Sequence, residues 1–477
     1  MAITARTAFQ AAPVQQVTSA NYLDLQDTGW AQQYLPDLME KEAEVYGKRT
    51  ISGFLGQVGA EEAMSADQVI WSEQGRLHLS YKATTTSAAA STMEISHDID
   101  GVGLTTTHGI RVGDQVLIAG GGQTITARVN TAAAGSATID VDPYGYANMS
   151  DAGFGDSDDT LTILVFGSEN AKGESYVGGR SNKPSFTTFT NKPIILRDQY
   201  EVSGSDAAQI GWVEISGESG ENGYLWYLKA EGETRSRFTD YCEMSMIESE
   251  LVAVGSAIAL PTDGGAGTAG TEGLFAAVKS RGHQSSGLTG VNAATDLAEF
   301  DAILAEFDKN GAIEENMLFL NRGTSLAIDD MLASMNSYGA GGTSYGVFDN
   351  SEDMALNLGF SGFRRGSYDF YKSDWKYLND LATRGGINNA ATAGEDIRGI
   401  IIPAGTSSVY DQQLGKNMKR PFLHVRYRAS QLESRKFKTW ITGSVGASTS
   451  DLDAMTVNFL SERCLITQGA NNFMLLN

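Results

Sequence analysis

The longest helical pattern in the chain runs from Gly223 to Val254 and contains no proline. At about 1.5 Å per residue, this helix would be about 45 Å long, which is longer than most globular cores require. At about 100° per residue its apolar side chains gather on one broad face, which we expect to be buried. That face includes Tyr227, Leu228, Phe238, Tyr241, Cys242 and Met246. The other side is mostly charged, so we expect it to meet water or another chain; a core helix of an ordinary enzyme is the alternative.

Two strand patterns precede this helix. Residues 69–81 alternate apolar and polar side chains after Gly75, and a second extended run covers 193–202. The simplest interpretation pairs the two runs as a long antiparallel hairpin. The sequence between them is too long for a turn and therefore forms an insertion.

The insertion carries its own β pattern. Alternation with a period of two residues runs through 109–130, 136–146 and 159–167, with turns at Gly113-Asp114 and at Gly120 to Gly122. The three glycines are followed by another strand rather than by a helix N-terminus, which argues against a phosphate-binding loop. We therefore predict a small β module.

The segment after the long helix begins with a glycine-rich break at 260–273. Beyond it, Thr295-Asp296 caps a predicted helix that ends at Gly311, and a buried strand covers 317–320. A second helix follows, capped by Thr324 or Ser325. Further strand patterns cover 362–378, 398–405, 420–428, 438–447 and the C-terminal residues. This succession predicts an α+β or α/β layer.

Composition narrows the class of protein. A chain of 477 residues exceeds what one hydrophobic core usually supports, so we expect two or more domains. The formal charge of −23 argues against a protein whose main task is to grip nucleic acid. The first 20 residues are polar and predict an extended arm, with a short amphipathic helix at 35–46. No apolar signal core or run of about 18 apolar residues occurs, so we expect a soluble cytoplasmic product without a membrane partner.

The search for reactive groups gives few candidates. Cys242 and Cys464 follow no metal or disulfide spacing and are expected to be core residues. Of the five histidines, His97 lies nearest to acidic residues, Asp98 and Asp100, on a polar segment. The acidic loop 150–159 lacks the ligand spacing of a calcium loop. We therefore predict no catalytic, cofactor-binding or metal-binding residues, and an enzyme becomes the minority interpretation.

The order of elements resembles the major capsid proteins of tailed double-stranded-DNA bacteriophages, which have the Hong Kong 97-type fold. The resemblance rests on the polar arm, the long loop, the spine helix 223–254, the glycine-rich crossing and the following ENMLFLNRGTSLAIDDML. The segments FLSERCLITQGANNFMLLN and WSEQGRLHLSY are most similar to capsid proteins of crAss-like phages. No short diagnostic motif is present, and we identify no Lys and Asn pair for the crosslinks of some relatives.

The resemblance implies an α+β fold with six parts. They are an N-terminal arm (1–66), an extended loop (67–92 and 170–203), a β-rich insertion in that loop (93–169), a peripheral domain with the spine helix (204–262), an axial domain (263–420) and return strands (421–477). It also implies self-assembly into hexamers and pentamers of an icosahedral shell around DNA, in a virion assembled in the host cytoplasm. Portal and head decoration or auxiliary proteins would be partners, and packaged DNA would be held non-specifically.

Two other interpretations stay open: an encapsulin-like compartment shell, and a β-rich surface or S-layer protein, which should carry an export signal. A basic stretch at 416–438 predicts a solvated strand face, a contact between subunits, or a weak contact with DNA. We favour the subunit contact because a wall that binds DNA strongly would hinder packing and release. The candidate contact residues are Arg76, Arg197, Arg420, Arg426 and Arg428.

Overall fold

The computed structural model describes residues 55, 60–99, 101, 103–104, 108–133, 135–156, 161–173, 175, 186–205, 214–216, 222–252, 270–310, 313–336, 362–388, 396–404, 406–411, 416–444 and 449–477. Every described residue lies in the unit formed by residues 52–477. The predicted arm up to residue 54 and the predicted helix at 35–46 lie outside the described residues. The described part is a mixed α+β structure with more strand than helix. None of its helices is long and apolar enough to cross a bilayer.

A five-stranded sheet, called here the central sheet, is built on strand β22 (Ala454–Thr467). One edge of β22 pairs antiparallel with β10 (Ile194–Ser203). Its other edge pairs antiparallel with β21 (Lys438–Gly443) and then β20 (Leu423–Arg428). Strand β1 (Ala60–Met64) runs parallel to β20, so these residues are an edge strand and not part of an arm.

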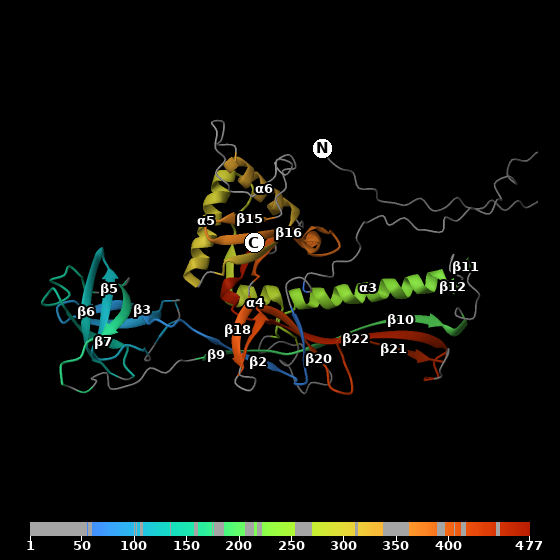
Figure 1. Ribbon diagram of the computed structural model, residues 1–477, viewed down its shortest axis with the longest axis horizontal. Helices are drawn as coiled ribbons and strands as arrows, with labels where there is room; N and C mark the ends of the chain where they lie inside the picture. Colours follow the sequence, from blue (N-terminus) through green and yellow to red (C-terminus); the bar gives the residue numbers. More distant parts are fainter. Residues whose placement is uncertain are drawn as a thin grey trace, which may run out of the picture. The chain divides into compact units, whose positions relative to one another are not determined.

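The long helix α3 (Leu225–Glu248) lies along β10 and β22 (Figure 1). Phe238 and Cys242 pack against Val457 and Phe459 of β22. The helix is shorter than the predicted 223–254. Its start is fixed because β11 (Glu214–Ser216) and β12 (Asn222–Tyr224) form a two-stranded ribbon just before it. Its end is followed by Leu251, which bridges to Gly270.

A second ribbon, called here the loop ribbon, pairs β2 (Val69–Gln74) with β9 (Phe186–Asn191). The predicted pairing of 69–81 with 193–202 is therefore wrong. Gly75 ends the first strand. The second run corresponds to β10, which pairs with β22 at ten positions instead. The loop ribbon buries Val69 and Trp71 against Cys464 and Ile466. Because side chains alternate along a strand, these β22 residues lie on the face opposite Val457 and Phe459, so the ribbon and α3 cover opposite faces.

The insertion is a closed six-stranded barrel with the order β3-β4-β7-β6-β5-β8. Its strands are β3 (Ser80–Ser87), β4 (Thr92–Asp98), β5 (Asp114–Gly120), β6 (Gln123–Ala132), β7 (Thr138–Pro143) and β8 (Leu161–Ser168). It begins at Ser80, so residues 80–92 belong to the barrel and not to the extended loop as predicted. Gly121 and Gly122, with φ of 57° and 80°, make the predicted tight turn, because both positions need a left-handed backbone.

The remaining described elements form a second sheet with helices packed against it. The sheet order is β13-β23-β17-β14-β16-β15. The strands are β13 (His283–Ser285), β14 (Glu315–Leu320), β15 (Gly362–Arg365), β16 (Tyr368–Asp374), β17 (Gly399–Pro403) and β23 (Met474–Leu476). The helices are α4 (Leu274–Arg281), α5 (Ala293–Asn310), α6 (Arg322–Asn336), α8 (Lys376–Asn379), α9 (Arg384–Asn388) and η2 (Ala470–Asn472). A further ribbon pairs β18 (Thr406–Asp411) with β19 (Lys416–Pro421).

Helices α5 and α6 cover the core of this second sheet, with Phe300, Ile303 and Ile328 buried against Leu318 and Phe370. The strand predicted at 317–320 lies within β14. The helix predicted from Thr295-Asp296 corresponds to α5, but its predicted cap is wrong: α5 begins at Ala293, and Asn292 Oδ1 accepts a hydrogen bond from Ala294 N at 2.9 Å. The predicted stop at Gly311 lies outside the described residues. The predicted cap of α6 is wrong: the helix begins at Arg322, and Asn321 Oδ1 accepts a hydrogen bond from Thr324 N at 2.8 Å. Asn321 is a good cap because its short side chain reaches the unpaired N–H groups of the first turn. The predicted boundaries of the peripheral and axial domains stay predictions.

Replacing Phe238 with alanine should destabilise the chain by about 3–5 kcal/mol, because its ring is 1 % exposed, stacks on Phe459 and meets Phe437 edge to face. Urea unfolding followed by circular dichroism measures this. Tyr241→Ala on the same helix is the control and should cost less than about 1 kcal/mol, because its side chain is 46 % exposed. Equal losses in the two variants would contradict the packing of α3.

Candidate functional site

The base of the loop ribbon is held by Arg281, the last residue of α4. Its guanidinium carbon lies 4.4 Å from the ring centre of Phe189 and 5.7 Å from that of Trp71. The same group pairs with Glu272 at 2.6 Å and with Glu73 at 3.7 Å. A guanidinium can stack on a ring while its edge still donates to carboxylates. Arg281 therefore ties α4 to both strands of the ribbon.

Two carboxylates complete this anchor. Glu73 Oε1 accepts hydrogen bonds from Trp71 Nε1 and from Gly469 N, both at 3.0 Å, so it connects the ribbon to the turn that follows β22. Burial raises the pKa of the Glu272 carboxyl, and the charge of Arg281 opposes that rise. The ion pair with Arg281 thus compensates part of the cost of burying Glu272.

Asn191, at the end of β9, is a second connection and is 1 % exposed. Its Nδ2 donates to the carbonyls of Leu465 at 2.6 Å and Glu272 at 3.0 Å. Its Oδ1 accepts from Thr271 Oγ1 at 3.0 Å and from the N–H groups of Lys192 and Glu272, both at 2.8 Å. One amide therefore joins the ribbon, strand β22 and the start of α4.

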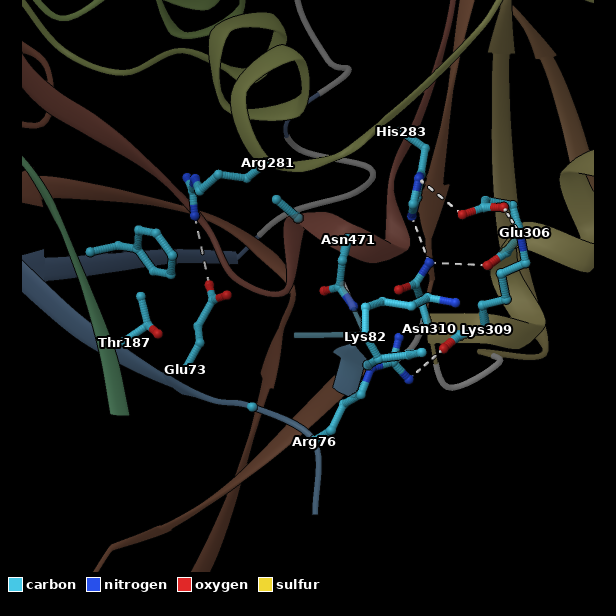
Figure 2. A pocket seen from close by; sticks show the side chains of 14 residues that line it. Glu73, Arg76, Lys82, Thr187, Arg281, His283, Glu306, Lys309, Asn310 and Asn471 are labelled. Atoms are coloured by element: carbon cyan, nitrogen blue, oxygen red, sulfur yellow. Dashed lines mark hydrogen bonds and ion pairs between the residues drawn. The ribbon is translucent and has the colours of Figure 1, made fainter. Parts of the chain in front are cut away.

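A cleft of about 1040 Å³ opens beside this anchor (Figure 2). Figure 2 shows Arg281 and Glu73 on one side and His283, Glu306 and Asn310 on the other. Across it, Arg76 Nη1 donates to the carbonyl of Lys309 at 2.8 Å. The lining residues are Glu73, Gly75, Arg76, Lys82, Ile99, Thr187, Phe189, Arg281, His283, Glu306, Lys309, Asn310, Ala470 and Asn471. The cleft is thus a junction between the loop ribbon, the start of the barrel and the end of α5.

The cleft offers mainly polar bridging contacts. His283 Nε2 and Asn310 Nδ2 lie 2.6 Å apart, and His283 Nδ1 lies 3.9 Å from Glu306 Oε1. The hydrogen bond from Lys309 lowers the pKa of Glu306, and a carboxyl with a lowered pKa is a poor general acid at neutral pH. In the ranges given above, no three His, Cys, Asp or Glu side chains are grouped to hold a metal ion.

The predicted contact arginines take different positions. Arg426 pairs with Glu62 of β1 at 3.1 Å, and Arg428 pairs with Glu462 at 3.1 Å and with Asp67. Arg76 donates across the cleft as described above, and Arg197 stacks on Trp440. The side chain of Arg420 lies outside the described residues. Arg76, Arg197, Arg426 and Arg428 thus make contacts within the chain. A role for any of the five between subunits stays a prediction.

The predicted buried face of the spine helix is partly different in the structure. Phe238, Cys242 and Met246 are buried, whereas Tyr241 is 46 % exposed. The side chains of Tyr227 and Leu228 lie outside the described residues.

The expected polar side of the same helix is buried instead near its C-terminal end. Ile247 is 1 % exposed there, and the buried Glu243 accepts a hydrogen bond from Leu55 N at 3.0 Å through Oε1. Helix α4 also packs against α3. The buried face is therefore rotated away from Tyr241.

Sequence reasoning missed the anchor residues Asn191, Arg281 and Glu73. Their partners are remote: Asn191 bonds Leu465, 274 positions away, and Glu73 bonds Gly469, 396 positions away. The only local signal is the position of Asn191 between two extended runs, and an asparagine there usually predicts a turn.

Several solved structures are similar to this chain at low sequence identity. One is titled the capsid structure of the cyanophage P-SCSP1u, with a TM-score of 0.42 and 9 % identity over 96 % of this chain and 98 % of that one. A Microbacterium phage Oxtober96 structure has a TM-score of 0.40 and 8 % identity over 95 % and 99 %. The mature capsid of bacteriophage PhiM1 has a TM-score of 0.34 and 8 % identity over 66 % and 78 %.

No family model and no curated protein matches the chain. The TM-scores of the three structures lie below 0.5, so this similarity carries no conclusion about family or function.

Replacing Asn191 with alanine should cost about 2–4 kcal/mol of unfolding free energy, because it leaves the buried carbonyl of Leu465 and N–H of Glu272 without their partner. Asn148→Ala is the matched control, since Asn148 makes a turn hydrogen bond to Asp151 N and should cost less than about 1 kcal/mol. Denaturant unfolding compares the two. A loss for Asn191→Ala no greater than the control would contradict the role of this amide.

Both cysteine thiols should be unreactive in the native chain. Cys242 and Cys464 are 1 % and 0 % exposed, and burial raises the pKa of both thiols, that of Cys464 to about 12. At pH 8 we expect no reaction with a disulfide reagent until denaturant is added, since the reactive form is the thiolate. Thr188→Cys, on the exposed side of β9, is the reactive control. Reaction of a native cysteine as fast as the control would contradict the burial.

Proposed function

We propose that the chain is the major capsid subunit of a tailed bacteriophage, which assembles into hexamers and pentamers of an icosahedral shell around double-stranded DNA. The observation that carries this proposal is the loop ribbon. Its two strands pair with no third strand in the described ranges, and one face is anchored to the central sheet while Ile70 on the other face is 63 % exposed.

A ribbon of this kind needs a partner surface. Two-stranded ribbons are marginally stable alone, and their outer edges present N–H and C=O groups that another chain can contact. The anchor of Arg281, Glu73 and Asn191 fixes the base of the ribbon without covering its exposed face. A neighbouring subunit would supply the missing cover, and the same contact repeated around a ring would build a capsomer.

The order of the elements supports the same proposal. A looped-out ribbon with an inserted barrel is followed by helix α3 on the central sheet, then by a second layered unit, and the chain returns to both sheets through β22 and β23. This is the succession implied by the resemblance to Hong Kong 97-type capsid proteins. A subunit whose C-terminal strands join both sheets can couple its contact with one neighbour to its contact with the next.

The net charge bears on the proposed partners. With 58 acidic and 35 basic residues, the subunit would repel DNA on average and hold it without sequence preference. Portal and decoration or auxiliary proteins would join the shell at its openings and surface. The proposed location is the virion, after assembly in the host cytoplasm.

Purified protein, tested over a range of salt and crowding conditions, should form closed particles visible by electron microscopy and sedimenting far faster than a 50.9 kDa monomer. Arg281→Ala should lower particle yield by about tenfold, because it releases the base of the ribbon. Arg364→Ala, which removes an exposed ion pair with Asp369, is the control and should keep the wild-type yield. Monomers alone under every condition would contradict the proposal.

A further inference from the structure

The central sheet has one face that the described residues cover only in part. Helix α3 covers one face at Val457 and Phe459, and the loop ribbon covers the other face at Cys464 and Ile466. Beyond the ribbon, on that second face, the sheet continues along β22 toward Asn458. In the described ranges no helix or strand packs over this part, which we call the open face. Its side chains are Ile195, Arg197 and Gln199 of β10, Leu460 and Asn458 of β22, and Lys438 and Trp440 of β21.

The strand register places these residues side by side. Leu460 lies between Arg197 and Lys438, and Asn458 lies between Gln199 and Trp440. Leu460 and Asn458 are buried under their neighbours, whereas Ile195 is 56 % exposed and Arg197 and Gln199 are exposed. The open face thus combines an apolar side chain, an indole and exposed polar groups, which is the composition typical of protein contact centres.

Two cations share the ring of Trp440. The guanidinium carbon of Arg197 lies 5.7 Å from the ring centre, and Lys438 Nζ lies 5.6 Å from it. Lys438 already pairs with Glu433 at 2.6 Å. For Arg197 no ion pair with a carboxylate is formed among the described residues. Stacking orients its guanidinium and leaves the N–H groups on its edge able to donate two parallel hydrogen bonds to a carboxylate.

We propose that the open face binds a second copy of this chain, and that Arg197 on Trp440 receives a carboxylate from that copy. The proposal rests on the proposed function and names one of its contact surfaces. Charge favours this occupant: each copy carries 58 acidic against 35 basic residues, so a neighbour presents carboxylates in excess. The loop ribbon already packs on the adjacent part of the same face, so a second copy would extend a layer that the chain itself begins.

Packaged DNA fits this surface less well. Glu201 follows Gln199 on the same side of β10, and Glu433 already neutralises Lys438, so the surface lacks the row of cations that phosphate contacts need. A DNA contact would also predict a steep loss of binding with salt. A protein contact that includes the indole of Trp440 keeps its apolar contribution to binding when the salt concentration is raised.

The experiment compares charge reversals on the two faces of the sheet. Arg197→Glu should lower particle yield by about tenfold or more, with an unchanged melting temperature of the free subunit. Arg237→Glu, on α3 at the opposite face, is the matched control and removes an exposed ion pair with Asp198 at 3.2 Å. It should assemble like the wild type. Wild-type yield in Arg197→Glu, or an equal loss in the control, would overturn the assignment.

A photo-crosslinking amino acid in place of Gln199 gives a second readout that does not depend on yield. Under assembly conditions it should produce a covalent dimer of the chain, and peptide mapping should find an acidic segment at the partner end. A crosslink to added DNA in place of the dimer would overturn the choice of occupant. If particles form without any crosslinked dimer, only the assignment of this surface is contradicted. If neither particles nor dimer form, the proposed function is contradicted as well.

Discussion

Strand β22 is the element on which the rest of the described structure depends. Helix α3 buries its residues Val457 and Phe459 on one face, and the loop ribbon buries Cys464 and Ile466 on the other. Its two edges are occupied by β10 on one side and by β21 and β20 on the other. A strand enclosed on both faces has little freedom of register, because a slip of one residue would exchange the side chains of its two faces.

The same segment connects the two sheets. After β22, a turn at Gly469 with φ of 60° leads through η2 into β23, which lies between β13 and β17 of the second sheet. The N–H of Gly469 is held by Glu73 of the loop ribbon, and Asn191 holds the carbonyl of Leu465. The position of the ribbon is therefore set by polar contacts to the backbone of β22 and not by hydrophobic burial alone.

The elements that depend on local sequence pattern were predicted correctly. The predictions were wrong where the partner of a strand or side chain lies far away in the sequence. The spine helix, α5, β14 and the hairpin turn at Gly121-Gly122 follow from periodicity and turn chemistry. The pairing of 193–202 was wrong because β22, more than 250 positions away along the chain, offers a longer partner than the nearby strand. Tyr241 was wrongly placed in the core because helix periodicity cannot show that α4 packs on the other side.

The anchor residues were invisible for the same reason, since Asn191 and Arg281 gain their roles only from segments that folding brings together. Charge patterning indicated arginines of interest, but it could not separate Arg426 and Arg428, which pair within the sheet, from Arg197, which stacks on a ring. An exposed face with an oriented arginine beside a fixed ribbon is what the proposed contact between two copies of the chain requires.

Hydrogen exchange of the free subunit tests the central role of β22 most directly. If this strand organises the structure, the amides of residues 457–465 should exchange at least about tenfold more slowly than those of β2 and β9, because opening them requires both sheet edges to separate. Exchange in β22 as fast as in the loop ribbon would show that the ribbon and α3 do not enclose it, and would contradict this account.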